Sequence, residues 1–153
     1  DAQLNRLGLR HRKGAPETFD AAGYAHALHR VRAGEPDVYV PGFERDVEQP
    51  VAAALVIPAA ARLVVTEGNY LLLGAERWAA ARAEMDQVWF VTGDEDVRLR
   101  RLVARHVQFG KGEIQAREWV AVNDEPNAVL VHHTMPSADL VVENSADGWL
   151  LVR

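Results

Sequence analysis

The sequence predicts an α/β fold with a largely parallel sheet. Short apolar, β-branched runs recur along the chain, and segments with helical periodicity lie between them, which is the alternation typical of parallel sheets. The chain has 153 residues, of which 48% are hydrophobic, so it can bury a sizeable core. We therefore expect a single domain over residues 1–153.

Each element is assigned from its local pattern. Apolar residues repeating every three or four positions indicate a helix, and a short β-branched run that ends at Gly, Pro or Asp indicates a strand. Asp20 is a good N-cap for the helix after it, and Pro41 with Gly42 should stop the preceding strand. The expected elements are a brief helix in 1–11, a loop over 12–20, a helix between Asp20 and Gly34, strands over 38–40, 51–57 and 63–66, a helix over 74–85, a strand over 87–91, helices over 97–107, 113–122 and 125–134, and strands over 138–143 and 149–152.

The stretch around Glu67 suggests a functional site. Leu63 to Thr66 are apolar or β-branched and lead directly into Glu67 and Gly68, as a buried parallel strand would. Open α/β sheets bind ligands at the carboxyl ends of their strands, where a carboxylate could hold Mg²⁺ through water. An ordinary turn with one charged residue explains the stretch equally well from these residues alone.

Two groups of cations accompany this carboxylate. Arg98, Arg101 and Arg105 share one helical face, and Lys111 follows between two glycines; forked guanidinium donors suit phosphate oxygens. The loop over 12–20 combines two cations, two acids and a proline-stiffened bend. A solvated helix face and a capped loop are the plain alternatives. Taken together, a metal carboxylate, a cationic lid and an acceptor loop are parts of a phosphoryl-transfer site.

The order of these motifs resembles the superfamily of P-loop kinases that contains phosphoribulokinase, uridine kinase and pantothenate kinase, especially its bacterial nucleoside-kinase-like and fructose-transport-kinase-like members. Residues 12–20 are similar to the Lys-Gly-x-Pro-Glu-Ser-Tyr-Asp loop of pantothenate kinases, and residues 66–69 resemble the Glu-Gly turn after the third core strand. Residues 96–111 look like the lid helix that contacts ATP phosphates. The resemblance implies a three-layer fold with helices on both faces of a mostly parallel sheet and a lid over about 95–115.

The resemblance also implies an activity and a set of site residues. It implies ATP- and Mg²⁺-dependent phosphorylation of a hydroxyl on a small metabolite, such as a nucleoside, a pantothenate-like molecule or a sugar. The implied roles are catalysis by Arg101 and Arg105, ATP binding by Arg98, Arg105, Lys111 and Asn127, acceptor binding by Arg12, Lys13, Asp20, Tyr39, Arg45 and Asn69, and magnesium placement by Glu67.

The chain departs from the family pattern at several points. It contains no G-x-x-x-x-G-K-[ST], and the family's P-loop and catalytic base would precede Asp1. We therefore expect a C-terminal kinase portion, inactive by itself, whose N-terminal P-loop unit is absent. His106 replaces an acid and Leu102 an arginine of uridine kinases, which argues against a true uridine kinase. The alternative is a non-catalytic module that binds a metabolite or a partner.

The composition limits the classes of partner and ligand that the protein is expected to bind. The net charge of −5 argues against a nucleic-acid partner. The absence of cysteine excludes disulfides and thiolate metal sites and suits a cytoplasmic protein. No apolar run approaches the roughly 18–20 residues of a membrane span. The expected ligands are ATP and a small-molecule acceptor, and formation of a homodimer is left open.

Overall fold

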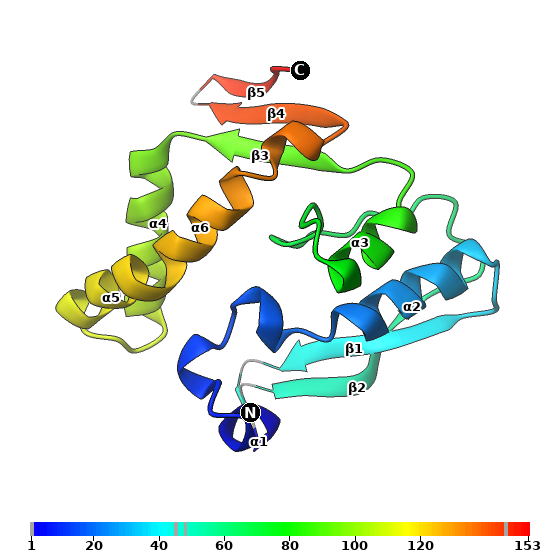
Figure 1. The fold of residues 1–153 in the computed structure, drawn as a ribbon, viewed down its shortest axis with the longest axis horizontal. Helices are drawn as coiled ribbons and strands as arrows, with labels where there is room; N and C mark the ends of the chain where they lie inside the picture. The colour runs from blue at the N-terminus through cyan, green and yellow to red at the C-terminus, as the bar shows by residue number, and fades with distance from the viewer. Residues whose placement is uncertain (1, 45, 48, 146) are drawn as a thin grey trace. The chain divides into compact units, whose positions relative to one another are not determined.

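The computed structural model describes residues 2–44, 46–47, 49–145 and 147–153. They group into two compact units, residues 1–86 and residues 87–153 (Figure 1). The first unit contains a β-hairpin and the second contains a three-stranded sheet. The single domain expected over residues 1–153 stays a prediction.

Helices frame the first unit. The expected cap is confirmed, because the Asp20 carboxylate accepts a hydrogen bond from the backbone N–H of Gly23 at 2.9 Å, satisfying a donor that the first turn leaves free. The buried apolar residues of this unit include small alanines that let its helices approach closely: Ala15, Ala21, Ala25, Val38, Tyr70, Leu71, Trp78 and Ala81. The helical elements are α1 (Ala2–Arg6), α2 (Ala21–Arg32), α3 (Glu76–Ala83) and single 3₁₀ turns at Arg10–Arg12 and Pro16–Thr18.

The hairpin of the first unit pairs β1 (Val38–Glu44) with β2 (Gln49–Ile57) in antiparallel orientation. The prediction that Pro41 and Gly42 end the first strand was wrong, because β1 continues through both. Proline has no N–H to donate to a ladder, and the register shifts between Val40 and Gly42. On the opposite strand Ala53 adopts a φ of 54°, so a local bulge accommodates the proline without ending the strand.

The strand expected over residues 63–66 is not formed. This segment has no ladder partner among the described residues, and the side chains of Leu63 and Val65 are 80% and 84% exposed. A β-run becomes a buried strand only when neighbouring strands take up its backbone groups. Glu67 therefore follows an extended segment rather than the end of a paired strand.

The second unit is built on a sheet in the order β3-β4-β5, comprising β3 (Trp89–Gly93), β4 (Leu140–Ser145) and β5 (Gly148–Leu151). β3 and β4 are parallel, whereas β4 and β5 form an antiparallel hairpin. Asp139 fixes the start of the parallel pair, because its carboxylate accepts from the backbone N–H of Val88 at 2.6 Å and its own N–H donates to the Val88 carbonyl at 2.9 Å.

Helices connect the parallel strands β3 and β4, as Figure 1 shows. α4 (Glu95–Gln108) is followed by α5 (Glu113–Trp119), a π-helical turn (Val120–Asp124) and α6 (Glu125–His132). The two helices expected over 113–122 and 125–134 thus run into each other. Pro126 cannot donate a backbone hydrogen bond, and at this point the N–H of Glu125 donates to the Val120 carbonyl five residues back, which produces the wider turn.

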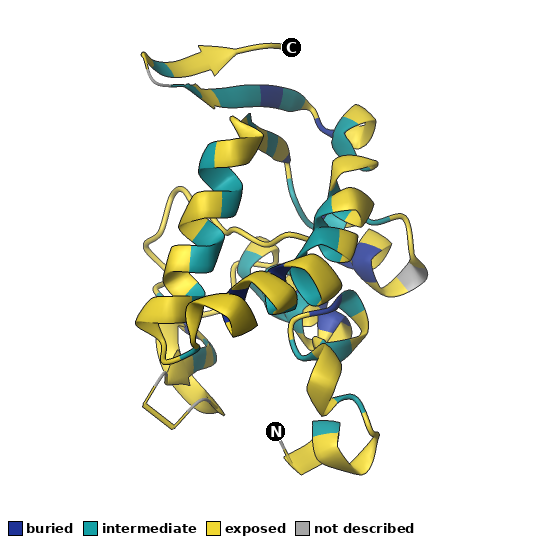
Figure 2. Cartoon of the chain, turned by 90° about the vertical axis from the view of Figure 1, so that its left-hand side faces the viewer, coloured by how far each residue is buried: buried dark blue, intermediate teal, exposed yellow. Residues whose placement is uncertain are grey.

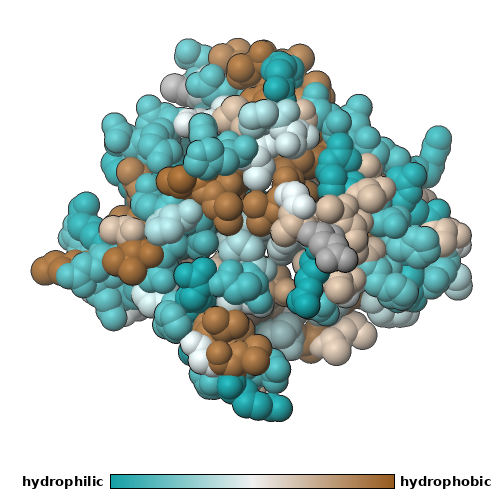
Figure 3. Space-filling model, viewed as in Figure 1, coloured by the Kyte–Doolittle hydropathy of each residue, from teal (hydrophilic) through white to brown (hydrophobic). Residues whose placement is uncertain are grey.

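Burial in both units is limited to short stretches, as Figure 2 shows. In the second unit the buried apolar residues are Val88, Ala116, Val120, Ala138 and Val141. Apolar side chains of β5 are more than half exposed, and Figure 3 shows hydrophobic atoms over the β4–β5 hairpin at the top of the view. Within the described residues, no helix combines the length and apolar character that crossing a membrane requires.

Candidate functional site

In the first unit, the loop over 12–20 is fixed to the segment that carries Glu67. The Tyr70 hydroxyl donates to the Gly14 carbonyl at 2.6 Å, and the Gly14 N–H donates to the Thr18 hydroxyl oxygen at 3.1 Å. Gly14 has a φ of 103°, a conformation that residues with a Cβ rarely adopt. The glycine of the Lys-Gly-x-Pro pattern is therefore required by the backbone of the loop.

A second tyrosine fixes the same segment on the other side of Glu67. The hydroxyls of Tyr24, in α2, and Thr66 lie 2.6 Å apart and share a hydrogen bond. Burial raises the pKa of the Tyr24 phenol, and the negative charge of Glu67 raises it further, because both disfavour the phenolate. Tyr70 also packs edge-on against Phe19 at a ring-centroid distance of 5.7 Å. The turn at Glu67 is thus held between two tyrosine anchors.

The acceptor residues expected from the sequence differ in how far they are engaged. Arg12 forms an ion pair with Glu17, which lowers the pKa of that carboxyl group. The Lys13 ammonium lies 5.2 Å from the ring centroid of Phe43, a cation–π contact. Asp20 serves as the cap of α2. Tyr39 and Asn69 are exposed, and Arg45 lies outside the described residues.

Glu67 is an exposed carboxylate without a hydrogen bond or ion pair to any residue that the structure describes. The described part of the chain contains no group of three or more His, Asp or Glu side chains that could hold a metal ion. Magnesium usually keeps several waters and takes only one or two carboxylates, with the rest supplied by substrate phosphates. A single exposed carboxylate fits that kind of site, whereas a fully protein-coordinated metal does not fit.

In the second unit, the arginines of α4 divide into two kinds. Arg101 and Arg105 are exposed, and their side chains form no ion pair or hydrogen bond with the residues that the structure describes. They are four positions apart and so project from the same face of α4. Asp94 caps this helix by accepting from the Val97 N–H at 2.8 Å, which fixes where the face begins.

Arg98 is already bound to carboxylates. It donates to Glu95 through Nε at 2.9 Å and through Nη2 at 2.5 Å, and it also forms an ion pair with Glu125 at the start of α6. The hydrogen bond to Glu95, and then the contact with Glu125, raise the pKa of Arg98. Its guanidinium therefore joins α4 to α6, and its Nε and Nη2 donors already have carboxylate partners.

Lys111 lies in a cluster that links the loop after α4 to the π turn. Its Nζ is 3.2 Å from His106 Nδ1 and 4.8 Å from the ring centroid of Trp119. The other ring nitrogen, His106 Nε2, is 2.8 Å from Asp124 Oδ2. From the sequence, His106 was placed in the apolar stripe of the helix and noted as a departure from a family pattern, and Asp124 was not singled out.

Asn127 has a structural partner beside the same turn. Its side-chain amide donates to the Asn123 carbonyl at 2.8 Å, within the segment where the π turn alters the backbone hydrogen bonds. One amide N–H is thereby committed, while the amide group as a whole carries a second donor and an acceptor. The predicted contact of Asn127 with ATP stays a prediction.

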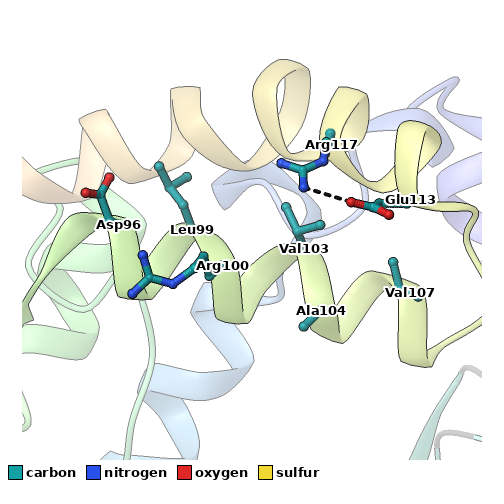
Figure 4. A pocket seen from close by; sticks show the side chains of 8 residues that line it. All are labelled: Asp96, Leu99, Arg100, Val103, Ala104, Val107, Glu113 and Arg117. Atoms are coloured by element: carbon teal, nitrogen blue, oxygen red, sulfur yellow. Dashed lines mark hydrogen bonds and ion pairs between the residues drawn. The ribbon is translucent and has the colours of Figure 1, made fainter.

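An open apolar groove of about 490 Å³ runs between α4 and α5 (Figure 4). Leu99, Val103 and Val107 line it, and the Arg117–Glu113 ion pair lies at its edge at 2.8 Å. At about 100° per residue, these α4 side chains point away from the face of Arg101 and Arg105. The groove is therefore distinct from the cationic face that the sequence singled out.

Solved structures share this architecture. A candidate fructose transport system kinase from Silicibacter sp. TM1040 matches with a TM-score of 0.84 and 31% identity, over 92% of this chain and 68% of that one. The chain belongs to the P-loop kinase superfamily. YFH7 from Saccharomyces cerevisiae, a candidate P-loop kinase with a circular permutation, shares the fold with a TM-score of 0.73 at 23% identity, over 96% of this chain and 52% of that one.

Curated relatives of this P-loop kinase chain agree with that placement. An ATP-dependent kinase-like protein, notR′ of Aspergillus versicolor, is 38% identical over 65% of this chain, and YggC of Escherichia coli is 35% identical over 95%. The chain spans 60% of the length of each. No family model matches it. The α/β fold class and the superfamily predicted from the sequence are confirmed.

Within the P-loop kinase chain, the predicted residues gather into two groups. The first unit brings the loop over 12–20 together with the turn at Glu67 through Tyr24 and Tyr70. The second unit places Arg101 and Arg105 on one face of α4 and Lys111 just beyond its end. Of the residues assigned roles from the sequence, Arg98, Asp20 and Asn127 already make side-chain contacts within their own unit.

Proposed function

We propose that the chain is the acceptor-binding and lid-bearing portion of an ATP-dependent kinase that phosphorylates a hydroxyl on a small metabolite. The observation that carries the proposal is the pair of exposed guanidiniums at Arg101 and Arg105, which lack carboxylate partners among the described residues. They belong to a chain of which 92% matches a candidate fructose transport system kinase. Two uncompensated cations on one helical face are suited to bind a polyphosphate.

The role proposed for the second unit is electrostatic. Phosphoryl transfer spreads negative charge over the transferring oxygens, and catalysis depends on cations aimed at that charge. Arg101, Arg105 and Lys111 supply these cations. Arg98 is assigned a supporting role, because its contacts with Glu95 and Glu125 hold α4 against the start of α6.

The role proposed for the first unit is to receive the acceptor and to assist Mg²⁺. Glu67 is the carboxylate that would hold the ion through water, and magnesium there would screen the charge of the phosphates. Lys13, Tyr39 and Asn69 would offer polar groups to the acceptor, and the hydrogen bond between Tyr70 and Gly14 fixes the loop that carries Lys13. The names of the relatives include a candidate uridine kinase, a pantothenate kinase and a candidate fructose transport kinase, so nucleoside, pantothenate-like and sugar hydroxyls are the acceptor classes to test.

The decisive experiment measures ADP release by the full-length gene product with MgATP and a panel of these acceptors. Arg105→Ala should lower turnover by about 10²-fold, the usual effect of removing a donor aimed at transition-state charge, with little change in acceptor affinity. Arg117→Ala removes an arginine of α5 that is paired with Glu113 and is the matched control. Unchanged turnover in Arg105→Ala would refute the lid assignment. Acceptor binding without ADP release would support the non-catalytic alternative instead.

A further inference from the structure

We infer that His106, held by Asp124, is a positioning residue that fixes the direction of the Lys111 ammonium. The inference rests on the proposed role of Lys111 as a phosphate-binding cation. It concerns only the second unit, in which α4, the glycine-flanked loop, α5 and the π turn all contribute to one polar cluster.

The backbone brings Lys111 back to His106. At the end of α4 the Lys111 N–H donates to the His106 carbonyl at 3.1 Å, and the Gly110 N–H donates to the Val107 carbonyl at 3.0 Å. This pair of bonds, with a φ of 96° at Gly110, is a Schellman motif. Because the motif ties the main chain of Lys111 to the last full turn of α4, its side chain starts next to the His106 ring.

The side-chain contacts determine which way each hydrogen bond runs. A lysine ammonium can only donate and a carboxylate can only accept. The 3.2 Å contact therefore requires a lone pair on His106 Nδ1, and the 2.8 Å contact requires a proton on Nε2 that points at Asp124. Asp124 thereby selects the Nε2–H tautomer, and that tautomer is the one that can accept from Lys111.

The environment limits other arrangements of the ammonium. The side chains of His106 and Asp124 are only 16% and 27% exposed, so the hydrogen bond between them is partly shielded from water. The ring of Trp119 lies 4.8 Å from Lys111 Nζ and 6.4 Å from the His106 ring. An ammonium has three donors. With one donor used on His106, Lys111 keeps two for phosphate oxygens while its position is set in advance.

This arrangement should matter for binding because a lysine side chain loses considerable rotamer freedom when it is immobilised. For an unrestrained lysine side chain, that loss would occur when the phosphate binds. In this protein the contacts with His106 and Trp119 restrict the Lys111 side chain before phosphate binds. Removing the His106 nitrogens should therefore leave the charge of Lys111 intact but reduce its effect on a bound polyphosphate.

The sequence offers a direct test because it has only two lysines, Lys13 and Lys111. Both are acylated with an amine-specific reagent, and mass spectrometry gives the reactivity of Lys111 relative to Lys13. A hydrogen-bonded ammonium must leave its acceptor before it can react. His106→Phe, which keeps a ring against Trp119 but lacks both nitrogens, should raise this ratio by about fivefold, the value of one typical hydrogen bond.

Two further variants separate positioning from general loss of structure. His106→Gln keeps an amide that can donate to Asp124 and accept from Lys111, so it should return the ratio toward that of the wild type. Glu113→Gln breaks the exposed ion pair of α5 and should leave the ratio unchanged. Circular dichroism monitors folding of each variant. An unchanged ratio in a folded His106→Phe protein would overturn the inference, as would equal increases in His106→Gln and His106→Phe.

The same measurement with MgATP distinguishes failure of the inference from failure of the proposed function. If Lys111 binds phosphates, saturating MgATP should protect Lys111 of the full-length protein, and His106→Phe should weaken half-maximal protection several-fold. A His106 effect without any protection by MgATP would retain the positioning role and reject phosphate binding. Protection that is equally strong in His106→Phe would reject the positioning role and retain phosphate binding.

Discussion

At the scale of single residues, the two tyrosines beside Glu67 show how packing turns a loop motif into a defined site. The Tyr24 hydroxyl forms a hydrogen bond with Thr66, in the segment between β2 and α3. The Tyr70 hydroxyl, from the same segment, donates to Gly14 in the loop over 12–20. Tyr70 belongs to the stretch around Glu67 that suggested the site, whereas Tyr24 lies outside the motifs, and neither hydroxyl was assigned a role. Tyr24 was assigned only to the apolar face of a helix, because a sequence does not reveal that its hydroxyl reaches a threonine 42 positions away.

The ionisation of Tyr24 gives a prediction about stability at alkaline pH. Its pKa is raised in the folded protein, chiefly by burial and further by Glu67, so folding favours the neutral phenol. The resulting stability is present below the unfolded pKa of about 10 and is lost as pH rises through the higher folded value. Tyr24→Phe should lose about 1 kcal/mol at neutral pH with the hydrogen bond to Thr66, and its stability should fall less between about pH 9 and pH 11.

Urea denaturation across that pH range measures the effect. Tyr39→Phe is the matched control, since Tyr39 is 58% exposed and its hydroxyl makes no hydrogen bond among the described residues. The same alkaline loss in Tyr24→Phe as in the wild type would show that Tyr24 is not the group responsible.

At the scale of elements, the sequence predicts what is decided locally. The helices now seen as α2 and α4 were expected from periodicity and from caps such as Asp20, and α3 was expected from its content of Ala, Glu and Arg. The strands β3, β4 and β5 were expected from short apolar runs. The misses depend on distant partners. β1 passes through Pro41 only because β2 bulges opposite it. His106 contacts Asp124, the last residue of the π turn, 18 positions further along the chain.

The end of α4 yields a prediction at this scale. Gly110 has a φ of 96°, and a Cβ built there would meet no atom within 4 Å, so a Gly110→Ala substitution is opposed by the backbone conformation rather than by crowding. It should destabilise the protein by about 1 kcal/mol. It should also shift Lys111 relative to His106, because the Schellman bonds depend on this conformation.

Denaturation monitored by circular dichroism gives the loss in stability, and the Lys111-to-Lys13 acylation ratio reports the shift. Gly74→Ala is the control: a Cβ there also meets open space, and Gly74 does not have a positive φ. Equal stabilities for the two variants would mean that the conformation at Gly110 costs alanine little and that the cap does not constrain the loop.

At the scale of the whole molecule, the exposed segment over residues 63–66 connects the fold to the family. Its sequence has the character of a buried strand, yet Leu63 and Val65 are 80% and 84% exposed and no described strand pairs with it. Exposed apolar groups and unpaired backbone groups both carry a free-energy cost. Such a segment is therefore expected to gain a ladder partner when a neighbouring strand is supplied.

Amide hydrogen exchange tests this expectation. In the chain of residues 1–153, the amides of residues 63–66 should exchange rapidly, whereas those of Phe90 and Val91 in β3, which is paired with β4, should be protected. In a longer form that carries the family's N-terminal P-loop unit, protection over 63–66 should rise by at least about tenfold. That rise corresponds to roughly 1.4 kcal/mol in the free energy of local opening. β3 serves as the internal reference. Equal exchange over 63–66 in both forms would mean that Glu67 follows an unpaired segment in the longer form as well, and its proposed role in placing Mg²⁺ would then lose the support of a strand end.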